Sequence, residues 1–190
     1  VHFVHLGMIK CMTTFLQTRW LGCENYMYSL DGSANIQEHI SKAAQQPKIN
    51  KVNINLENIP NDGNIVISNE SFINTWPDDS LLKEGPFVRT NYLKKKREVA
   101  INSILDLTDT VLITVRNPIT WIKSLYAHYV RTGGTSDQAK FITSFEDLIL
   151  ANLDLSDLLP ALRKKNINVA LLPCELYNQD EAKFWSKYES

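Results

Sequence analysis

The sequence predicts an α/β fold, a three-layer sandwich in which helices cover both faces of a central parallel sheet. Short apolar runs alternate with segments of helical periodicity along the chain. Strands that alternate with helices are typical of the crossover units that build parallel sheets. The expected strands lie at residues 1–6, 65–68, 111–115 and 169–172.

Helical patterns fill most of the chain between these strands and after the last one. The expected helices lie at about 12–22, 36–46, 91–107, 118–131, 145–165 and 178–189. Two segments rich in turn-forming residues, 47–63 and 74–90, are predicted to be loops. The pair Gly133-Gly134 is predicted to end a helix.

Length and composition fit a single globular domain spanning residues 1–190. Hydrophobic residues make up 44% and charged residues 22%, ordinary values for a soluble protein. The net charge of −1 gives no general attraction to nucleic acid or to a membrane surface, so neither is an expected partner. The basic run 94–97 is predicted to be a solvated helix face. The last helix reaches Ser190 without a stop signal, so the chain is expected to be cut there or to continue.

The cysteines Cys11, Cys23 and Cys174 show neither the pattern of a disulfide framework nor the spacing of metal ligands, and no metal is expected. No apolar stretch approaches the ~20 residues that a membrane-spanning helix needs. A glycosylation sequon at residues 69–71 falls in the segment assigned below to the active site, where a glycan would block access. These features favour a cytoplasmic protein.

Residues 5–17, HLGMIKCMTTFLQ, contain the parts of an anion-binding loop. They follow the first predicted strand, and a helix is expected to begin near Thr13. The free N–H groups and partial positive charge of a first helical turn suit a phosphate-type anion. Thr13 and Thr14 would add hydroxyl donors, and Lys10 would add a point charge. The alternative is that Thr13 only caps the helix.

This loop differs from the common nucleotide-triphosphate loop, GxxxxGK[ST], in which the lysine directly precedes the hydroxyl. Here Lys10 lies three residues before Thr13, and no glycine directly precedes it. A kinase would also need a carboxylate at a neighbouring strand end to hold magnesium. The predicted strand 111–115 is followed instead by Arg116. A cation at this place disfavours a metal-dependent phosphoryl transferase.

Residues 115–130, VRNPITWIKSLYAHYV, form the most specific motif of the chain. Arg116 follows a buried strand and offers a forked, permanently charged donor, while Ser124 offers a hydroxyl. The two side chains could bind one phosphate. Trp121, Ser124 and His128 share one stripe of the predicted helix. Apolar packing explains the other residues of this helix, but it does not explain an arginine at a buried strand end.

Together these motifs resemble the sulfotransferases that use 3′-phosphoadenosine 5′-phosphosulfate (PAPS). The likeness lies in K-x-x-T-T-x-L-Q at residues 10–17 and in RNP at 116–118, followed by a serine eight residues past the arginine. Segments 65–72 and 169–177 are weaker landmarks of the bacterial and carbohydrate-directed branches. The resemblance implies an enzyme with a P-loop-NTPase-like core, PAPS as co-substrate and no metal.

The family's site residues can be carried over to matching positions. The first loop of the family holds the 5′-phosphosulfate, which implies donor contacts from Lys10, Cys11, Met12, Thr13 and Thr14. Lys10 would also be catalytic, because a cation is needed at the bridging oxygen where negative charge develops. Arg116 and Ser124 would hold the 3′-phosphate.

A base must also deprotonate the acceptor. Cytosolic members of the family have a histidine after the second strand, and Glu70 stands at the comparable place here. Glu70 is therefore the first candidate and His128 the second, although Glu70 could be a plain loop carboxylate and His128 a partly buried histidine. The acceptor is a small molecule, a lipid or a carbohydrate, the last suggested by the branch resemblance alone. Residues 25–60 and 74–90 would line its site.

Two departures from the family pattern bear on activity. Cys11 and Met12 stand where the family usually has serine or threonine and then glycine. If that position needs a positive φ, Met12 costs about 1 kcal/mol or more of strain. Two other functions therefore stay open, a small-molecule kinase with a degenerate loop and a non-catalytic nucleotide-binding protein. Dependence on magnesium and ATP would mark the first, and binding without transfer would mark the second.

Overall fold

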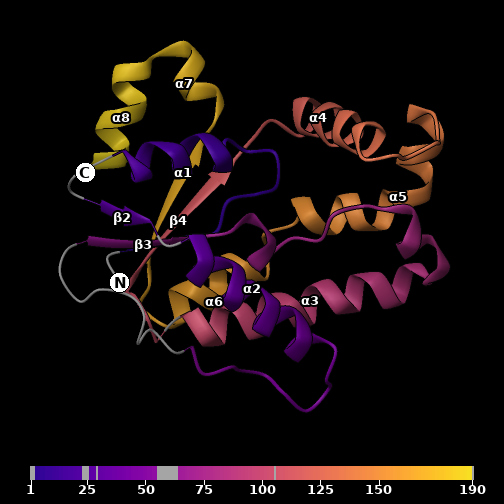
Figure 1. Ribbon diagram of the computed structural model, residues 1–190, viewed down its shortest axis with the longest axis horizontal. Helices are drawn as coiled ribbons and strands as arrows, with labels where there is room; N and C mark the ends of the chain where they lie inside the picture. The colour runs from indigo at the N-terminus through magenta and orange to yellow at the C-terminus, as the bar shows by residue number, and fades with distance from the viewer. Residues whose placement is uncertain (1–2, 23–25, 29, 55–63, 105, 190) are drawn as a thin grey trace.

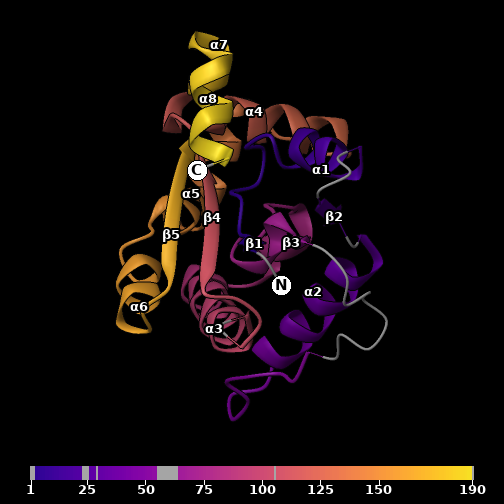
Figure 2. The ribbon, with the colours of Figure 1, turned by 90° about the vertical axis from the view of Figure 1, so that its left-hand side faces the viewer.

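The computed structural model describes residues 3–22, 26–28, 30–54, 64–104 and 106–189. Over these residues the chain forms a five-stranded parallel sheet in the order β2-β3-β1-β4-β5. The strands are β1 (Phe3–His5), β2 (Tyr26–Tyr28), β3 (Asn64–Ser68), β4 (Thr110–Val115) and β5 (Asn168–Pro173). Figure 2 shows β4 and β5 side by side, running toward α4 and α7 at the carboxyl end of the sheet.

Helices pack on both faces of this sheet (Figure 1). The helices are α1 (Thr13–Leu21), α2 (Leu30–Ala44), α3 (Pro86–Ile104), α4 (Pro118–Arg131), α5 (Gln138–Leu153), α6 (Leu158–Lys164), α7 (Glu175–Gln179) and α8 (Glu181–Glu189). Two short 3₁₀ turns, η1 (Glu70–Phe72) and η2 (Asp79–Lys83), lie between β3 and α3. The predicted α/β sandwich with a central parallel sheet is confirmed.

The alternation of side chains along each strand explains the layers. Val4 of β1 packs in a buried cluster with residues of α2, α3 and α6, whereas its neighbour Phe3 packs with α1 and α8 on the other face. Val111 and Leu112 of β4 divide between the same two clusters. A third cluster joins the loop after β1 to α4 and α5, beyond the carboxyl ends of the strands. This third cluster supports the site described below.

Several predicted boundaries were wrong. One expected helix, 145–165, is two helices, because Asp154 is extended and ends α5 before α6 begins. The expected helix 178–189 begins earlier and breaks in the same way at Asp180. Helix α3 starts at Pro86, within a predicted loop that also holds η2. The edge strand β2 was not predicted, since three residues give too short a pattern. Part of the predicted loop 47–63 lies outside the described residues.

Only the first part of the basic run on α3 is the solvated face that was predicted, since Lys94 is exposed while the last two residues are buried. Lys96 and Arg97 are 4% and 7% exposed. Arg97 donates hydrogen bonds to the carbonyl oxygens of Ile73, Asn152 and Asp154 at 2.8, 3.2 and 2.7 Å. These bonds tie α3 to the segment after η1 and to the end of α5. The two cations are buried because the chain folds carbonyl groups over them, which sequence spacing does not reveal.

None of the helices built from the described residues is long and apolar enough to cross a membrane. The cytoplasmic location stays a prediction.

Candidate active site

The carboxyl ends of β1 and β4 meet at the point where the strand order reverses. From β1 the chain leads through α1 to β2 on one side of the sheet, and from β4 it leads to β5 on the other. Ligands of open parallel sheets bind in the crevice at such a switch point. The predicted anion-binding loop follows β1, and Arg116 follows β4, so both motifs face this crevice.

The loop after β1 is held from three sides. Its backbone continues along β4, with the amide of Met8 donating to the carbonyl of Thr114 at 3.1 Å. Trp121 of α4 donates its indole N–H to the carbonyl of Ile9 at 2.7 Å. Arg116 donates from Nη1 to the carbonyl of Lys10 at 3.1 Å. The RNP motif and its helix therefore fix the position of the lysine loop, a function that the sequence motif did not reveal.

A buried histidine lies beneath the loop. His5 contacts Ser68 Oγ through Nδ1 at 2.8 Å and Thr114 Oγ1 through Nε2 at 3.0 Å, which joins β1 to both neighbouring strands. Burial lowers the pKa of His5 to about 3, so the ring is neutral. A Cβ on Gly7 would lie 2.6 Å from His5 Nε2, so this position has room only for glycine. His5 supports the loop from below as a neutral ring.

The loop adopts a left-handed conformation at two residues that are not glycine. Lys10 and Met12 both have φ of 61°. Met12 precedes the first helical residue, Thr13, and makes no side-chain capping bond to the first turn of α1. A left-handed residue followed by a right-handed one turns successive N–H groups toward a common point, which favours an anion. Thr13 is not the helix cap that was one possible interpretation, because Met12 occupies that position.

Two hydroxyls lie at this helix start. The Thr13 side chain is buried, and its Oγ1 has no hydrogen-bond partner of good geometry among the described residues. Thr14 is exposed. The Thr13 hydroxyl lies beside the carboxyl group of Glu70 and lowers the pKa of that group, so it links the helix start to Glu70. The neighbouring N–H groups of the first turn lack acceptors within the helix.

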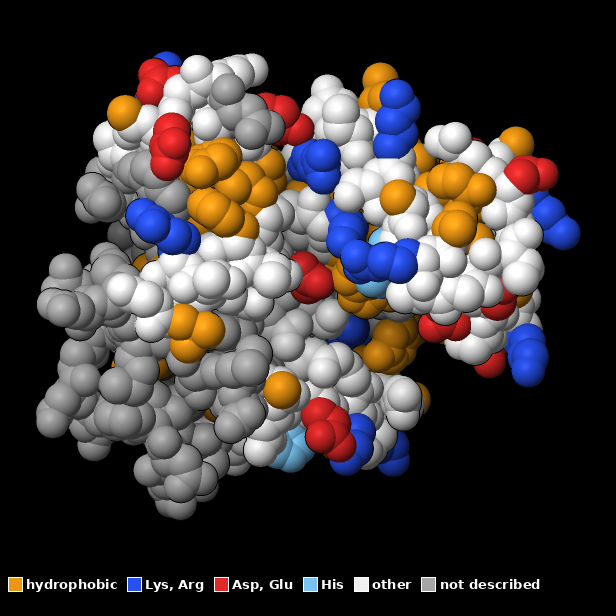
Figure 3. Space-filling view, turned by 45° about the horizontal axis from the view of Figure 1, so that its top comes forward, with side chains coloured by type: hydrophobic (Ala, Val, Ile, Leu, Met, Phe, Trp, Pro, Cys, Tyr) orange, Lys and Arg blue, Asp and Glu red, His pale blue; other side chains and the backbone are white. Residues whose placement is uncertain are grey.

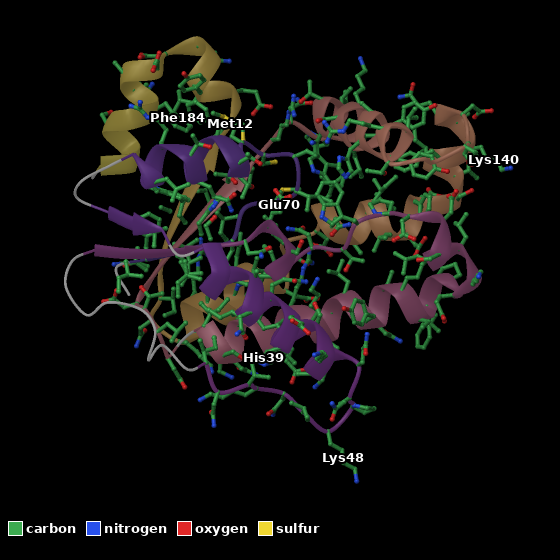
Figure 4. The ribbon with its side chains drawn as sticks, in the orientation of Figure 1. Met12, His39, Lys48, Glu70, Lys140 and Phe184 are labelled. Carbon is green, nitrogen blue, oxygen red and sulfur yellow. The ribbon has the colours of Figure 1, made fainter. Side chains whose placement is uncertain are left out.

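Glu70 begins η1, directly after β3, at the same end of the sheet as Met12 (Figure 4). Burial raises the pKa of its carboxyl group, while the Thr13 hydroxyl and the charge of Lys10 act in the opposite direction. These interactions place Glu70 beside the loop and the helix start. A half-buried carboxylate with a raised pKa has the properties of a general base.

His128 and Lys10 meet at an aromatic side chain that the sequence analysis missed. The rings of His128 and Trp76 lie 4.2 Å apart between centroids. Lys10 Nζ lies 6.0 Å from the centroid of Trp76. Burial, Lys10 and Arg131 lower the pKa of His128, so its ring is neutral at pH 7. Figure 3 shows basic side chains gathered around a histidine, with a carboxylate close by, on this face.

The tautomer of His128 follows from its neighbour. Arg131 Nη2 lies 2.9 Å from His128 Nδ1. Since a guanidinium only donates, Nδ1 accepts this bond, and the proton of the neutral ring lies on Nε2. His128 therefore presents a donor at its other nitrogen. This arrangement favours Glu70 over His128 as the base.

Four more residues complete the site: Arg116, Ser124, Glu175 and Cys11. Arg116 is half-buried against the loop and Ser124 is half-buried on α4, with no hydrogen bond joining them in the described part of the chain. Glu175 accepts a hydrogen bond from the amide of Asn117 at 2.8 Å, so it fixes the turn before α4. Cys11 is buried against Cys174, and a hydrogen bond between the thiols, together with burial, raises the pKa of Cys11. Cys11 is therefore a neutral thiol.

No protein-family model matches this sequence, and no curated protein matches it. Among solved structures, the chain is similar to a crystal structure of a sulfotransferase from Alicyclobacillus acidocaldarius, with a TM-score of 0.45 and 16% sequence identity. The match covers 96% of this chain and 76% of that chain. Likeness at this level assigns no activity. Fold and site together define an α/β protein with a lysine loop and a helix start at the switch point of its sheet.

Proposed function

We propose that the protein is a sulfotransferase that moves a sulfuryl group from PAPS to a hydroxyl or amine of an acceptor. The observation that carries the proposal is the convergence of Lys10, Glu70 and the start of α1 at one edge of the sheet. The N–H groups in the first turn of α1, which have no acceptors within the helix, support a bound anion at this place. The lysine, threonine and RNP motifs support PAPS as its source.

The 5′ end of the donor fits the start of α1. The N–H groups of the first turn, with the hydroxyls of Thr13 and Thr14, would hold the 5′-phosphate. Lys10 would place its ammonium group at the oxygen that bridges phosphorus and sulfur, where charge develops as the bond breaks. Its carbonyl is fixed by Arg116, so the lysine backbone is held before any ligand binds.

The 3′-phosphate would lie between Arg116 and Ser124. A guanidinium carries five N–H donors. The described residues use one of them, in the bond to the carbonyl of Lys10. The others, together with the Ser124 hydroxyl, provide charge-assisted donors for a phosphate. This contact would distinguish PAPS from nucleotides that lack a 3′-phosphate.

Glu70 would act as the base. It takes the proton of the acceptor hydroxyl while that oxygen bonds to sulfur, and the bond from sulfur to the bridging oxygen breaks with its electron pair leaving on the phosphate near Lys10. The products are the sulfated acceptor, 3′-phosphoadenosine 5′-phosphate (PAP) and a protonated Glu70. His128 would donate from Nε2 to an oxygen of the sulfuryl group.

The kinase alternative can be tested with the same protein. Isothermal titration with PAP, and separately with ADP and magnesium, should show preference for PAP without metal. Thr13→Val keeps the volume but removes the buried hydroxyl, and it should weaken PAP binding on the order of tenfold. Thr18→Val is the matched control, because Thr18 lies exposed on the same helix. Preference for ADP with magnesium would favour the kinase and contradict our proposal.

A further inference from the structure

Strand β5 forms one edge of the sheet and is open to solvent along most of its length. It is the last strand in the order β2-β3-β1-β4-β5, and among the described residues it pairs only with β4. Figure 2 shows it as the outermost strand, with α6 near its start and α7 near its end. Asn168, Ala170, Leu171 and Pro173 are exposed, Leu171 by 48%. This edge is therefore accessible to another strand.

The backbone of β5 directs hydrogen-bonding groups outward. The amide of Asn168 donates to the carbonyl of Asp109 at 2.7 Å, and the pairing with β4 continues in register, so the even-numbered residues of β5 face β4. Because the bonding direction alternates along a strand, Val169 and Leu171 point their N–H and C=O groups away from the sheet. Such an edge pairs readily with another strand unless a charge, a proline or a bulge protects it. Residues 168–172 contain no charge and no proline, and their register is unbroken.

Two positions limit how far a partner strand can pair with this edge. Pro173 is the next residue with outward-facing groups, and it has no N–H. At the other end, the amide of Ile167 already donates to a carbonyl of α6. The part of the edge with free N–H groups therefore consists of Val169 and Leu171, with Ala170 between them.

A second copy of the same edge, running antiparallel, matches this pattern in one register. With Ala170 opposite its own copy, Val169 faces the partner's Leu171, and the two residues can exchange both of their free hydrogen bonds. The positions without a free N–H, Ile167 and Pro173, then lie opposite each other. The central Ala170 forms a non-hydrogen-bonded pair, in which the Cα atoms approach to about 4.5 Å and a small side chain fits well. The edge is therefore complementary to itself.

The charges beyond the strand ends favour the same arrangement. Lys164 and Lys165 are exposed just before β5, and Glu175 is half-buried just after it. Antiparallel pairing brings the basic end of one copy to the acidic end of the other, and the register centred on Ala170 places Lys165 at the level of the partner's Glu175. A parallel copy would bring like charges together at both ends, which is unfavourable.

We propose that β5 pairs with β5 of a second copy of this chain across a two-fold axis at Ala170, so that the two five-stranded sheets become continuous. The interface is isologous, because both subunits use the same residues. The Val169 and Leu171 side chains form apolar cross-strand pairs that add to the backbone hydrogen bonds. This inference stands on the strand edge alone and does not depend on the proposed function.

Sedimentation velocity of the full chain, across roughly a hundredfold range of protein concentration, tests the pairing. We expect an equilibrium between monomer and dimer. Leu171→Lys should raise the dissociation constant on the order of tenfold or more, because a lysine on the edge opposes strand addition. Leu21→Lys is the matched control, since Leu21 is 64% exposed on α1, which packs against β2 and β3 at the other side of the sheet. It should leave the constant unchanged.

Cysteine cross-linking tests the register. Ala170→Cys should give a disulfide-linked dimer with copper phenanthroline as oxidant, because the two introduced thiols meet across the axis at a spacing that suits a disulfide. Asn168→Cys should not, since in this register it lies about 13 Å along the strand from its own copy. The wild type under the same oxidant is the control, and its described cysteines, Cys11 and Cys174, are buried.

Four outcomes would overturn the pairing. They are a monomer at every concentration, a dimer that Leu171→Lys leaves intact, equal cross-linking of Ala170→Cys and Asn168→Cys, and a monomer in which hydrogen exchange shows a protected Leu171 amide. The last result would mean that a strand other than a second copy of β5 covers this edge.

Discussion

Met12 holds a left-handed backbone conformation, with φ of 61° and ψ of 11°, at the start of α1. A side chain with a Cβ is strained in this region, and glycine is not. The sequence analysis identified this position as one where glycine is usual, and the structure shows the positive φ that makes glycine suitable. Met12 also packs against two apolar clusters, which compensates for part of the strain.

Comparison of Met12→Gly with Met12→Ala isolates the backbone strain, because both variants lose the same apolar contacts. We expect the glycine variant to be more stable by about 1 kcal/mol, the reverse of the usual order of these residues. Chemical denaturation of the two variants measures this difference. An alanine variant of equal or greater stability would show that φ at this position is not positive in solution.

We expect Glu70 to lower the stability of the folded protein at neutral pH while it serves as the base in the reaction. Its pKa is raised in the folded protein, so between its ordinary value and the raised one the folded state binds more protons than the unfolded state. The contribution of Glu70 to stability therefore falls as pH rises through this window. Glu70→Gln should be more stable than the wild type at pH 7, with a gain that shrinks below pH 4.5, and should lose sulfuryl transfer.

Denaturation at pH 7 and pH 4, together with release of PAP from PAPS in the presence of an acceptor, checks both parts of the Glu70 prediction. Glu146→Gln on α5 is the control, since Glu146 is exposed. Unchanged transfer in Glu70→Gln would exclude this carboxylate as the base.

At the scale of elements, α4 links the lysine loop after β1 to the start of α7. Its cap residue Asn117 accepts hydrogen bonds from the amides of Ile119 and Thr120. The Asn117 amide in turn donates to Glu175 at the start of α7. The orientation of α4 positions Trp121, which holds the lysine loop. Loss of the cap should therefore affect a loop that is distant in sequence.

Asn117→Ala tests this linkage against a second cap in the same protein. Asp137 caps α5 by accepting from the amide of Lys140, away from the crevice. Each alanine variant should lose about 1 kcal/mol of stability. Only Asn117→Ala should also weaken PAP binding, because only that cap orients Arg116 and Trp121. Titration and thermal unfolding of both variants measure the two effects, and equal binding would contradict the linkage.

At the scale of the whole molecule, the sequence was a good guide where a local pattern carries the information. Helix α4 was predicted with its observed bounds, because Asn117 and Pro118 mark its start and Gly133 its end. The strands β1, β3, β4 and β5 were found because buried parallel strands appear as apolar runs. The placement of Lys10 and Glu70 near each other followed from the rule that strand ends share one edge.

The remaining features depend on contacts between distant segments. Trp76 lies in a segment predicted only as a loop. The burial of Lys96 and Arg97 depends on carbonyl groups of residues 73–74 and 152–154, which no spacing within α3 could reveal. The support of the lysine loop by Arg116 joins residues that are 106 positions apart. Such contacts are set by tertiary packing.

The measurement that tests the central claim most directly compares PAP with adenosine 5′-monophosphate, which differs only by lacking the 3′-phosphate. Isothermal titration of the wild type should show preference for PAP on the order of a hundredfold, the usual effect of a charged hydrogen-bonded pair. Arg116→Ala should remove this preference, while Lys123→Ala, which removes an exposed cation on α4, should retain it. A general collapse of the loop would weaken both nucleotides equally. Equal affinity of the wild type for the two nucleotides, or an undiminished preference in Arg116→Ala, would contradict the assignment of this site to PAPS.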